Sequence, residues 1–124
     1  MITTTLSTTD IFIPIQAELQ AVEAKLREAS LDNQHPALTS ALEHLLASGG
    51  TRVRPAVALL SARLFDADPG RAVALAAAIE MLHTATLVHD DLIDGSLLRR
   101  GLPTLNAQWT PGATVLTGDF LFAR

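Results

Sequence analysis

The sequence predicts an all-α fold, and three observations support this prediction. Hydrophobic residues make up 48% of the 124 residues and aromatic residues only 4%, so any core must be aliphatic. Alanine and leucine, the residues that favour helices most strongly, supply much of that aliphatic content. Apolar residues recur at helical spacing between glycine and proline breaks, and no stretch alternates as a half-buried strand would.

Five helices are expected, over residues 10–29 (or 14–29), 36–48, 55–65, 69–94 and 110–124. In the first, apolar residues at helical spacing share one face: Ile15, Leu19, Val22 and Leu26. Gly49 and Gly50 are expected to end the second, because glycine adopts the left-handed cap conformation without steric cost. Residues 1–9 are expected to be disordered.

The fourth expected helix has clear signals at both ends. Asp68 is a suitable N-cap, Pro69 suits the first helical position, and Gly95 can end the helix. At 1.5 Å per residue it would be about 39 Å long, which is long for a small domain. The apolar face of the fifth helix needs other helices to cover it, and few apolar surfaces remain in the chain to do so. The whole chain, 1–124, is therefore predicted to be the N-terminal part of a single larger all-helical domain.

Composition excludes several classes of protein. The net charge is -4 and no basic stripe is present, which argues against nucleic-acid binding. Without cysteine, disulfides, zinc–thiolate sites and thiol nucleophiles are excluded. The first residues lack the features of a signal peptide. The most apolar window, residues 73–88, contains Glu80 and His83 and is interpreted as a buried core helix, so we expect a cytoplasmic protein.

Three carboxylates close the fourth helix. Asp90 and Asp94 are one turn apart, about 40° around the axis and about 6 Å along it, so both can face one metal site. Asp91 lies about 60° from Asp94 and could add a ligand. A few carboxylates completed by water and phosphate oxygens suit magnesium. The alternative is a solvated acidic helix end, although carboxylates at a helix C-terminus oppose its dipole.

Two histidines and a glutamate share this helix. His83 lies two turns before Asp90 on the same face, and either packs in the core or contacts a ligand. A helix-packing role is expected for His89, and a structural hydrogen bond for Glu80.

Two pairs of arginines complete the candidate site. Arg52 and Arg54 lie where a loop enters a helix, so guanidiniums and free amide donors can bind an anion together; the alternative is a solvated turn. Arg99 and Arg100 form a second cationic pair beyond Gly95. Two cationic sites beside one metal site indicate two phosphorylated substrates.

These segments together resemble the trans-isoprenyl diphosphate synthases (polyprenyl synthetases). The matching segments are Gly49-Gly50-Thr51-Arg52-Val53-Arg54-Pro55, similar to the family's GGKxxRP, residues 81–94, similar to its first aspartate-rich helix, and Arg99-Arg100-Gly101, Pro103-Thr104 and Gly118-Asp119-Phe120. The resemblance implies the N-terminal helices of the isoprenoid-synthase helical bundle, incomplete, from a synthase of the long-chain (solanesyl- or octaprenyl-like) type. It also implies a cytoplasmic homodimer at full length, with peripheral membrane association through a long-chain product.

The resemblance implies a role for each site residue. Asp90 and Asp94, with Asp91 supporting them, would bind Mg2+ together with an allylic diphosphate, which Arg99 would grip. The diphosphate of isopentenyl diphosphate would be held by Arg54, His83 and Arg100, with Arg52 adding a further cation. The implied reaction is a magnesium-dependent 1'-4 condensation that releases diphosphate.

Two departures from the family pattern are visible. Thr51 stands where the family has lysine, which removes one cation from the isopentenyl site, although Arg52 could compensate. No second aspartate-rich motif follows Asp94, so the isolated chain is expected to be inactive.

The resemblance also bears on product length, because a bulky aromatic residue four or five positions before the aspartates stops chain growth early in this family. Those positions are Ala85 and Thr86 here, which predicts a long product. Small residues could instead serve only helix packing.

Two other functions remain open at this point. Another metal-dependent diphosphate enzyme, such as a terpene cyclase, would share the aspartates but would not need the arginine segment at 49–55. A non-catalytic helical partner subunit would not need the intact aspartates.

Overall fold

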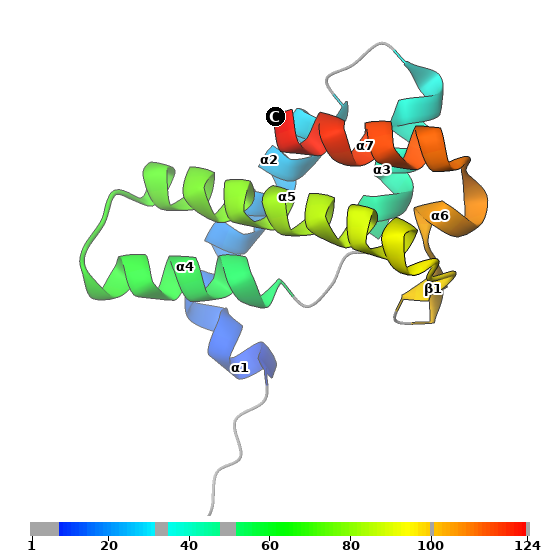
Figure 1. The fold of residues 1–124 in the computed structure, drawn as a ribbon. Coiled ribbons are helices and arrows are strands. Elements are labelled where there is room, and N and C mark those ends of the chain that lie inside the picture. Colours follow the sequence, from blue (N-terminus) through cyan, green and yellow to red (C-terminus); the bar gives the residue numbers. More distant parts are fainter. Residues whose placement is uncertain (1–7, 32–34, 48–51, 100, 124) are drawn as a thin grey trace, which may run out of the picture.

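The centre of the structure is a 26-residue helix, α5 (Pro69–Asp94), around which the other elements pack (Figure 1). The computed structural model describes residues 8–31, 35–47, 52–99 and 101–123. Its other elements are α1 (Thr8–Phe12), η1 (Ile13–Ile15), α2 (Gln16–Leu31), α3 (Pro36–Ala47), α4 (Val53–Leu64), β1 (Leu98–Arg99), β2 (Leu102–Pro103), α6 (Leu105–Gln108) and α7 (Pro111–Ala123). α2, α4 and α7 pack directly against α5. The prediction of an all-α fold is confirmed.

Both ends of α5 are where the sequence predicts them. The Asp68 side chain accepts a hydrogen bond from the Arg71 amide at 3.0 Å, and Pro69 occupies the first turn. Gly95, with φ of 67°, caps the other end, and its amide donates to the carbonyl oxygens of Asp91 and Leu92. These caps fix where the aspartates lie, because the chain leaves the helix directly after Asp94.

The other boundaries differ from the prediction in physically simple ways. The first predicted helix is divided, because Pro14 lies in the 3₁₀ turn η1 before α2 begins. α4 begins at Val53, two residues before Pro55, since the first turn of a helix tolerates proline. α1 begins at Thr8, inside the stretch expected to be disordered, while residues 1–7 lie outside the described residues. The short strands and α6 were not predicted.

The core is aliphatic, as the composition predicts. Its largest fully buried side chains include Ile15, Val22, Leu42 and Leu59, which come from η1, α2, α3 and α4. Ala76 and Ala85 of α5 have no exposed surface, so the neighbouring helices approach its backbone closely. The core therefore holds the α5 side chains at fixed positions relative to α2 and α4.

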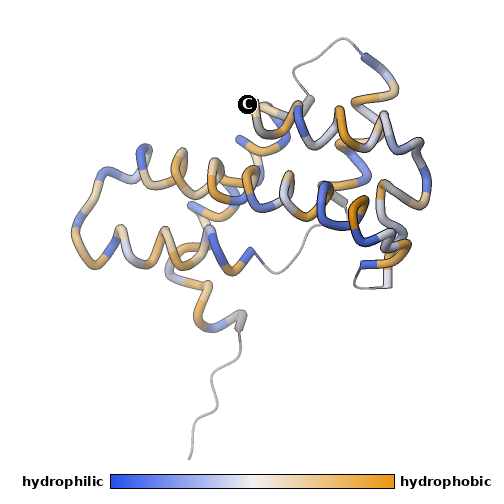
Figure 2. The backbone as a smooth tube through the Cα atoms, in the orientation of Figure 1, coloured by the Kyte–Doolittle hydropathy of each residue, from blue (hydrophilic) through white to orange (hydrophobic). Residues whose placement is uncertain are grey.

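α5 is also long and apolar enough, by length and composition, to cross a bilayer. Core helices of soluble proteins meet the same criterion, and 44% of the most apolar window of α5 is buried inside the molecule. Figure 2 shows that hydrophilic residues gather toward its C-terminal end, beside the β-hairpin.

Candidate functional site

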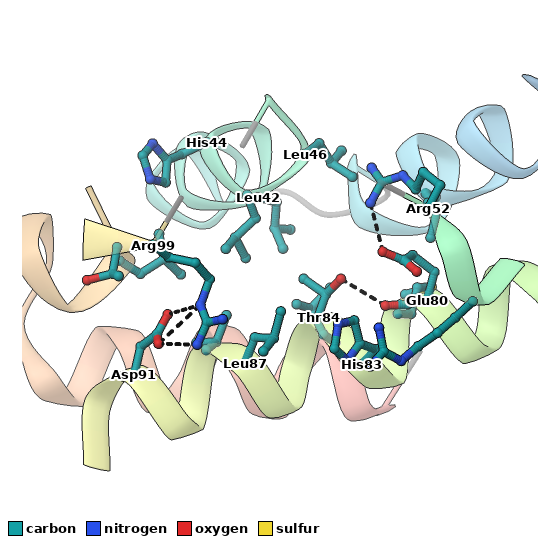
Figure 3. A pocket seen from close by; sticks show the side chains of 18 of the residues that line it. Leu42, His44, Leu46, Arg52, Glu80, His83, Thr84, Leu87, Asp91 and Arg99 are labelled. Carbon is teal, nitrogen blue, oxygen red and sulfur yellow. Dashed lines mark hydrogen bonds and ion pairs between the residues drawn. The ribbon is translucent and has the colours of Figure 1, made fainter. Parts of the chain in front are cut away.

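A pocket opens beside the C-terminal half of α5, between α3, the start of α4 and the hairpin (Figure 3). Its wall combines charged and apolar side chains. The charged and polar ones include Arg52, Arg54, Glu80, His83, Thr84, Asp91 and Arg99, and the apolar ones include Leu26, Leu42, Leu45, Met81, Leu87 and Val88. The pocket therefore joins three arginines to an apolar surface.

The sequence brings two acids of α5 to this wall. Glu80 and Asp91 are eleven residues apart, which is about three helical turns, so they lie nearly on one line along the helix. Both are buried, with 5% and 6% exposure. Each acid contacts one arginine from a neighbouring loop or strand, as Figure 3 shows.

Asp91 and Arg99 form a two-point ion pair. The Arg99 Nε donates to Oδ2 of Asp91 at 2.9 Å, and Nη2 donates to Oδ1 at 2.6 Å. The Asp91 hydrogen bonds raise the pKa of Arg99 against the effect of burial, and the negative charges of Asp91, Asp90 and Asp94 raise it further. Both carboxylate oxygens of Asp91 are thus engaged by the guanidinium.

Asp90 and Asp94 have a different environment from Asp91. Both are exposed, and neither side chain forms an ion pair or hydrogen bond within the described part of the chain. They are not part of the pocket wall itself but lie at the end of α5 beside it. Two open carboxylates one turn apart suit magnesium that also keeps waters and phosphate oxygens. No group of three or more His, Asp or Glu side chains among the described residues could hold a metal alone.

The predicted cations at the other end of the pocket also differ from one another. Arg52 bonds to two carboxylates: Nη1 donates to Glu80 Oε1 at 2.9 Å, and Nε donates to Glu23 Oε1. Arg54 lines the pocket, is exposed, and has no ion pair among the residues that the structure describes. This geometry favours a structural role for Arg52 and leaves Arg54 available to a ligand.

Burial alone would lower the pKa of Arg52. The hydrogen bonds and charge of Glu23, together with those of Glu80, outweigh burial and raise that pKa above its ordinary value. Arg52 therefore stays charged, and the structural hydrogen bond predicted for Glu80 is confirmed.

The two histidines of α5 have separate surroundings. His83 is half-buried and lines the pocket, as a ligand contact would. His89 faces α7 instead: its Nε2 is 3.2 Å from the Val115 carbonyl oxygen and 3.4 Å from Asp119 Oδ1. A carbonyl oxygen can only accept, so Nε2 bears the proton. The helix-packing role expected for His89 is confirmed.

Sequence reasoning missed Glu23, and it quoted Thr104 only as part of a matching segment, without a role. Glu23 has no local signal, since it is 29 residues from Arg52 in the chain. Thr104 is buried and joins two loops, because its hydroxyl donates to the Ser96 carbonyl at 2.7 Å and accepts from the Ala107 amide at 3.2 Å. Its position before a short helix is an N-cap signal that could have indicated this role. Arg100, Thr51 and the glycines at 49–50 lie outside the described residues.

The two positions connected with product length are not equivalent. Ala85 has no exposed surface and belongs to the core, whereas Thr86 is half-buried and donates to the His83 carbonyl at 2.6 Å. Neither appears in the pocket wall.

Comparison of the sequence with known proteins finds relatives among the prenyl transferases. The sequence is 44% identical over 122 residues to a prenyl transferase of Synechocystis sp., covering 96% of this chain and 38% of that protein. It is also 44% identical over 116 residues to the geranyl-diphosphate-specific all-trans-nonaprenyl-diphosphate synthase of Rhodobacter capsulatus, covering 93% of this chain and 35% of that protein. The chain thus spans somewhat more than a third of the length of these relatives.

Solved structures agree with the sequence matches. The decaprenyl diphosphate synthase of Rhodobacter capsulatus superposes with a TM-score of 0.89 at 39% identity, covering 94% of this chain and 36% of that one. The polyprenyl synthase of Caulobacter crescentus, complexed with calcium and isoprenyl diphosphate, gives 0.89 at 38% identity, covering 98% and 37%. The profile of the polyprenyl synthetase family matches residues 35–124.

Proposed function

This chain belongs to the polyprenyl synthetase family, and on that premise we propose that it forms the first substrate-binding wall of a prenyltransferase. The reaction proposed is condensation of an allylic diphosphate with isopentenyl diphosphate, with release of diphosphate. One observation supports this most directly: the exposed carboxylates Asp90 and Asp94 lie at the end of α5 beside a partly apolar pocket, whose wall includes the exposed Arg99 and Arg54. Such a pocket suits molecules that have a charged diphosphate and a hydrocarbon tail.

Asp90 and Asp94 are proposed to hold Mg2+ together with the allylic diphosphate. Their open carboxylates fit a metal that takes its remaining ligands from water and phosphate oxygens. The Caulobacter crescentus relative was solved with calcium and isoprenyl diphosphate, which supports the same pairing here. The bound metal supplies charge withdrawal from the leaving diphosphate.

Arg99 is proposed to contact the allylic diphosphate, and Asp91 to orient Arg99. Both Asp91 oxygens accept from Arg99, so the guanidinium is held beside the carboxylates by a two-point contact. Asp91 is thereby assigned as a positioning residue, with Asp90 and Asp94 as the metal ligands of α5.

The second diphosphate is assigned to the opposite end of the pocket. Arg54 and His83 line that end. Arg100 is proposed as a further ligand of this diphosphate from the sequence pattern alone, since it lies outside the described residues. The apolar wall between the two ends, including Leu87 and Val88, would receive the hydrocarbon chains and keep water from the reacting carbons. Bond formation then joins the isopentenyl double bond to the allylic carbon as the diphosphate leaves, and the isopentenyl unit loses a proton to the released diphosphate, which restores a double bond.

Further properties follow from the same proposal. A long product is proposed, because no aromatic side chain stands at Ala85 or Thr86. A homodimer, a cytoplasmic location and membrane association through the product are proposed for the enzyme that contains these helices. The isolated chain is proposed to bind substrate without turnover, because the described residues bring together no group of three or more His, Asp or Glu side chains that could hold a metal.

The test is a prenyl-transfer assay with the chain, radiolabelled isopentenyl diphosphate, geranyl diphosphate and Mg2+, alongside a binding measurement of each substrate. We expect magnesium-dependent binding of geranyl diphosphate and no labelled product. Absence of any diphosphate binding would contradict the proposed site, and turnover would contradict the proposed inactivity of the isolated chain.

A further inference from the structure

Arg52, the N-cap residue directly before α4, has a backbone conformation that is unfavourable for its residue type. Its φ is 57° and its ψ 31°, in the left-handed region, and no side-chain cap bond satisfies the first turn of the helix. Residues with a Cβ adopt this region at a cost, so neighbouring contacts must hold it there.

Those contacts come from two helices distant in sequence. Three nitrogens of the Arg52 guanidinium donate to carboxylates: Nη1 to Glu80 of α5 at 2.9 Å, and Nε and Nη2 to Glu23 of α2, the latter at 3.4 Å. The Arg52 side chain is 15% exposed and that of Glu80 only 7%. The guanidinium thus bridges α2 and α5 at the point where α4 begins.

Charge makes this bridge a poor site for an anion. One guanidinium and two carboxylates sum to -1, so a diphosphate approaching Arg52 would meet a net negative group. Arg54, two residues later, is exposed on the pocket wall with no ion pair among the described residues. The two arginines of this segment therefore differ in what they can do.

The backbone connects them. The Arg52 carbonyl accepts from the Ala56 amide at 3.1 Å, which closes the first turn of α4 around Arg54. Because the Arg52 side chain is bonded to α2 and α5, its backbone carbonyl ties the first turn of α4, and with it Arg54, to those two helices.

We propose that the Glu23–Arg52–Glu80 bridge is a positioning device that ties the start of α4 to α2 and α5 and so presents Arg54 to a diphosphate, with Arg52 itself making no ligand contact. The inference deepens the function proposed above and rests on it for the identity of the ligand.

The first test compares Arg52→Gly with Arg52→Ala in binding isopentenyl diphosphate, measured by calorimetry. Both remove the guanidinium and with it the bridge. The positioning role therefore predicts weaker binding by both variants, by about threefold or more. Wild-type affinity in both variants would overturn the proposal.

The second test asks whether removing a negative charge strengthens or weakens the binding of isopentenyl diphosphate. Glu23→Ala removes a negative charge near the pocket, which would strengthen anion binding if Arg52 were a ligand released from its partner. The positioning role predicts a weaker affinity instead, by about threefold or more. Glu28→Ala, an exposed acid on the same helix, is the matched control and should leave the affinity unchanged. Tighter binding by Glu23→Ala would contradict the proposal.

A readout without ligand separates this inference from the proposed function. Amide hydrogen exchange at Ala56 reports the turn that Arg52 closes, and Ala67, whose amide bonds to the Ala62 carbonyl at the other end of α4, is the internal reference. We expect faster exchange at Ala56 in Arg52→Ala and in Glu23→Ala, and no change in the control Glu28→Ala. Unchanged exchange at Ala56 in the first two variants would overturn the positioning role. Wild-type protein that binds no isopentenyl diphosphate would contradict the proposed function instead.

Discussion

Asp91 and Arg99 form a two-point ion pair that separates Asp91 from the two aspartates beside it in sequence. Its side chain is 9% exposed, and both of its oxygens accept from the guanidinium. Asp90 and Asp94 are open to solvent. One short acidic segment thus supplies two kinds of carboxylate, one structural and two available to a metal.

Asp91→Asn should therefore destabilise the fold, whereas Asp90→Asn should not. Loss of the Asp91 charge leaves a partly exposed Arg99 without its partner, and we expect about 1–2 kcal/mol lower free energy of unfolding. Asp90→Asn should fall within about 0.5 kcal/mol of wild type or be slightly stabilising, because it relieves repulsion at a helix C-terminus. Urea denaturation of the two variants checks this, and equal effects would contradict the division between the aspartates.

Features of the fold and the site that depend on neighbouring residues could be predicted from the sequence, whereas those that join residues far apart in the chain could not. The limits of α5 follow from Asp68, Pro69 and Gly95, which act within one turn of the helix ends. The identity of the site residues follows from local motifs. Which aspartate side chain faces the protein interior depends on how α5 is rotated about its axis relative to the hairpin. The Arg52–Glu23 contact joins residues 29 positions apart. No local pattern encodes either relationship.

Gly118 is predicted to be required for the approach of α5 and α7. A Cβ at this position would lie 2.2 Å from His89 Nε2, so Gly118→Ala must displace the imidazole or separate the helices. We expect a loss of about 1–3 kcal/mol in the free energy of unfolding. Gly112→Ala in the same helix is the control: a Cβ added there would have nothing within 4 Å, so this substitution should be neutral or slightly stabilising. Similar effects of the two substitutions would contradict the close contact at His89.

Ala85→Phe is predicted to destabilise the protein rather than only alter a product. Ala85 has no exposed surface, so a phenyl ring would overpack the core and lower the free energy of unfolding by about 1–3 kcal/mol or more. Leu82→Phe on the same helix, where the side chain is 53% exposed, should change it by less than about 0.5 kcal/mol. Thermal unfolding followed by circular dichroism compares them. If Ala85→Phe is as stable as Leu82→Phe, the close packing of α5 is wrong.

The proposed function depends most on Asp90 and Asp94 acting with magnesium, and calorimetric titration of geranyl diphosphate with and without Mg2+ tests this most directly. We predict magnesium-dependent binding by wild type, and at least about tenfold weaker binding by Asp90→Asn and by Asp94→Asn. Asp66→Asn, an exposed acid at the far end of α4, should bind as wild type does. Magnesium-dependent binding that survives in the double variant Asp90→Asn/Asp94→Asn would contradict the assignment of these carboxylates.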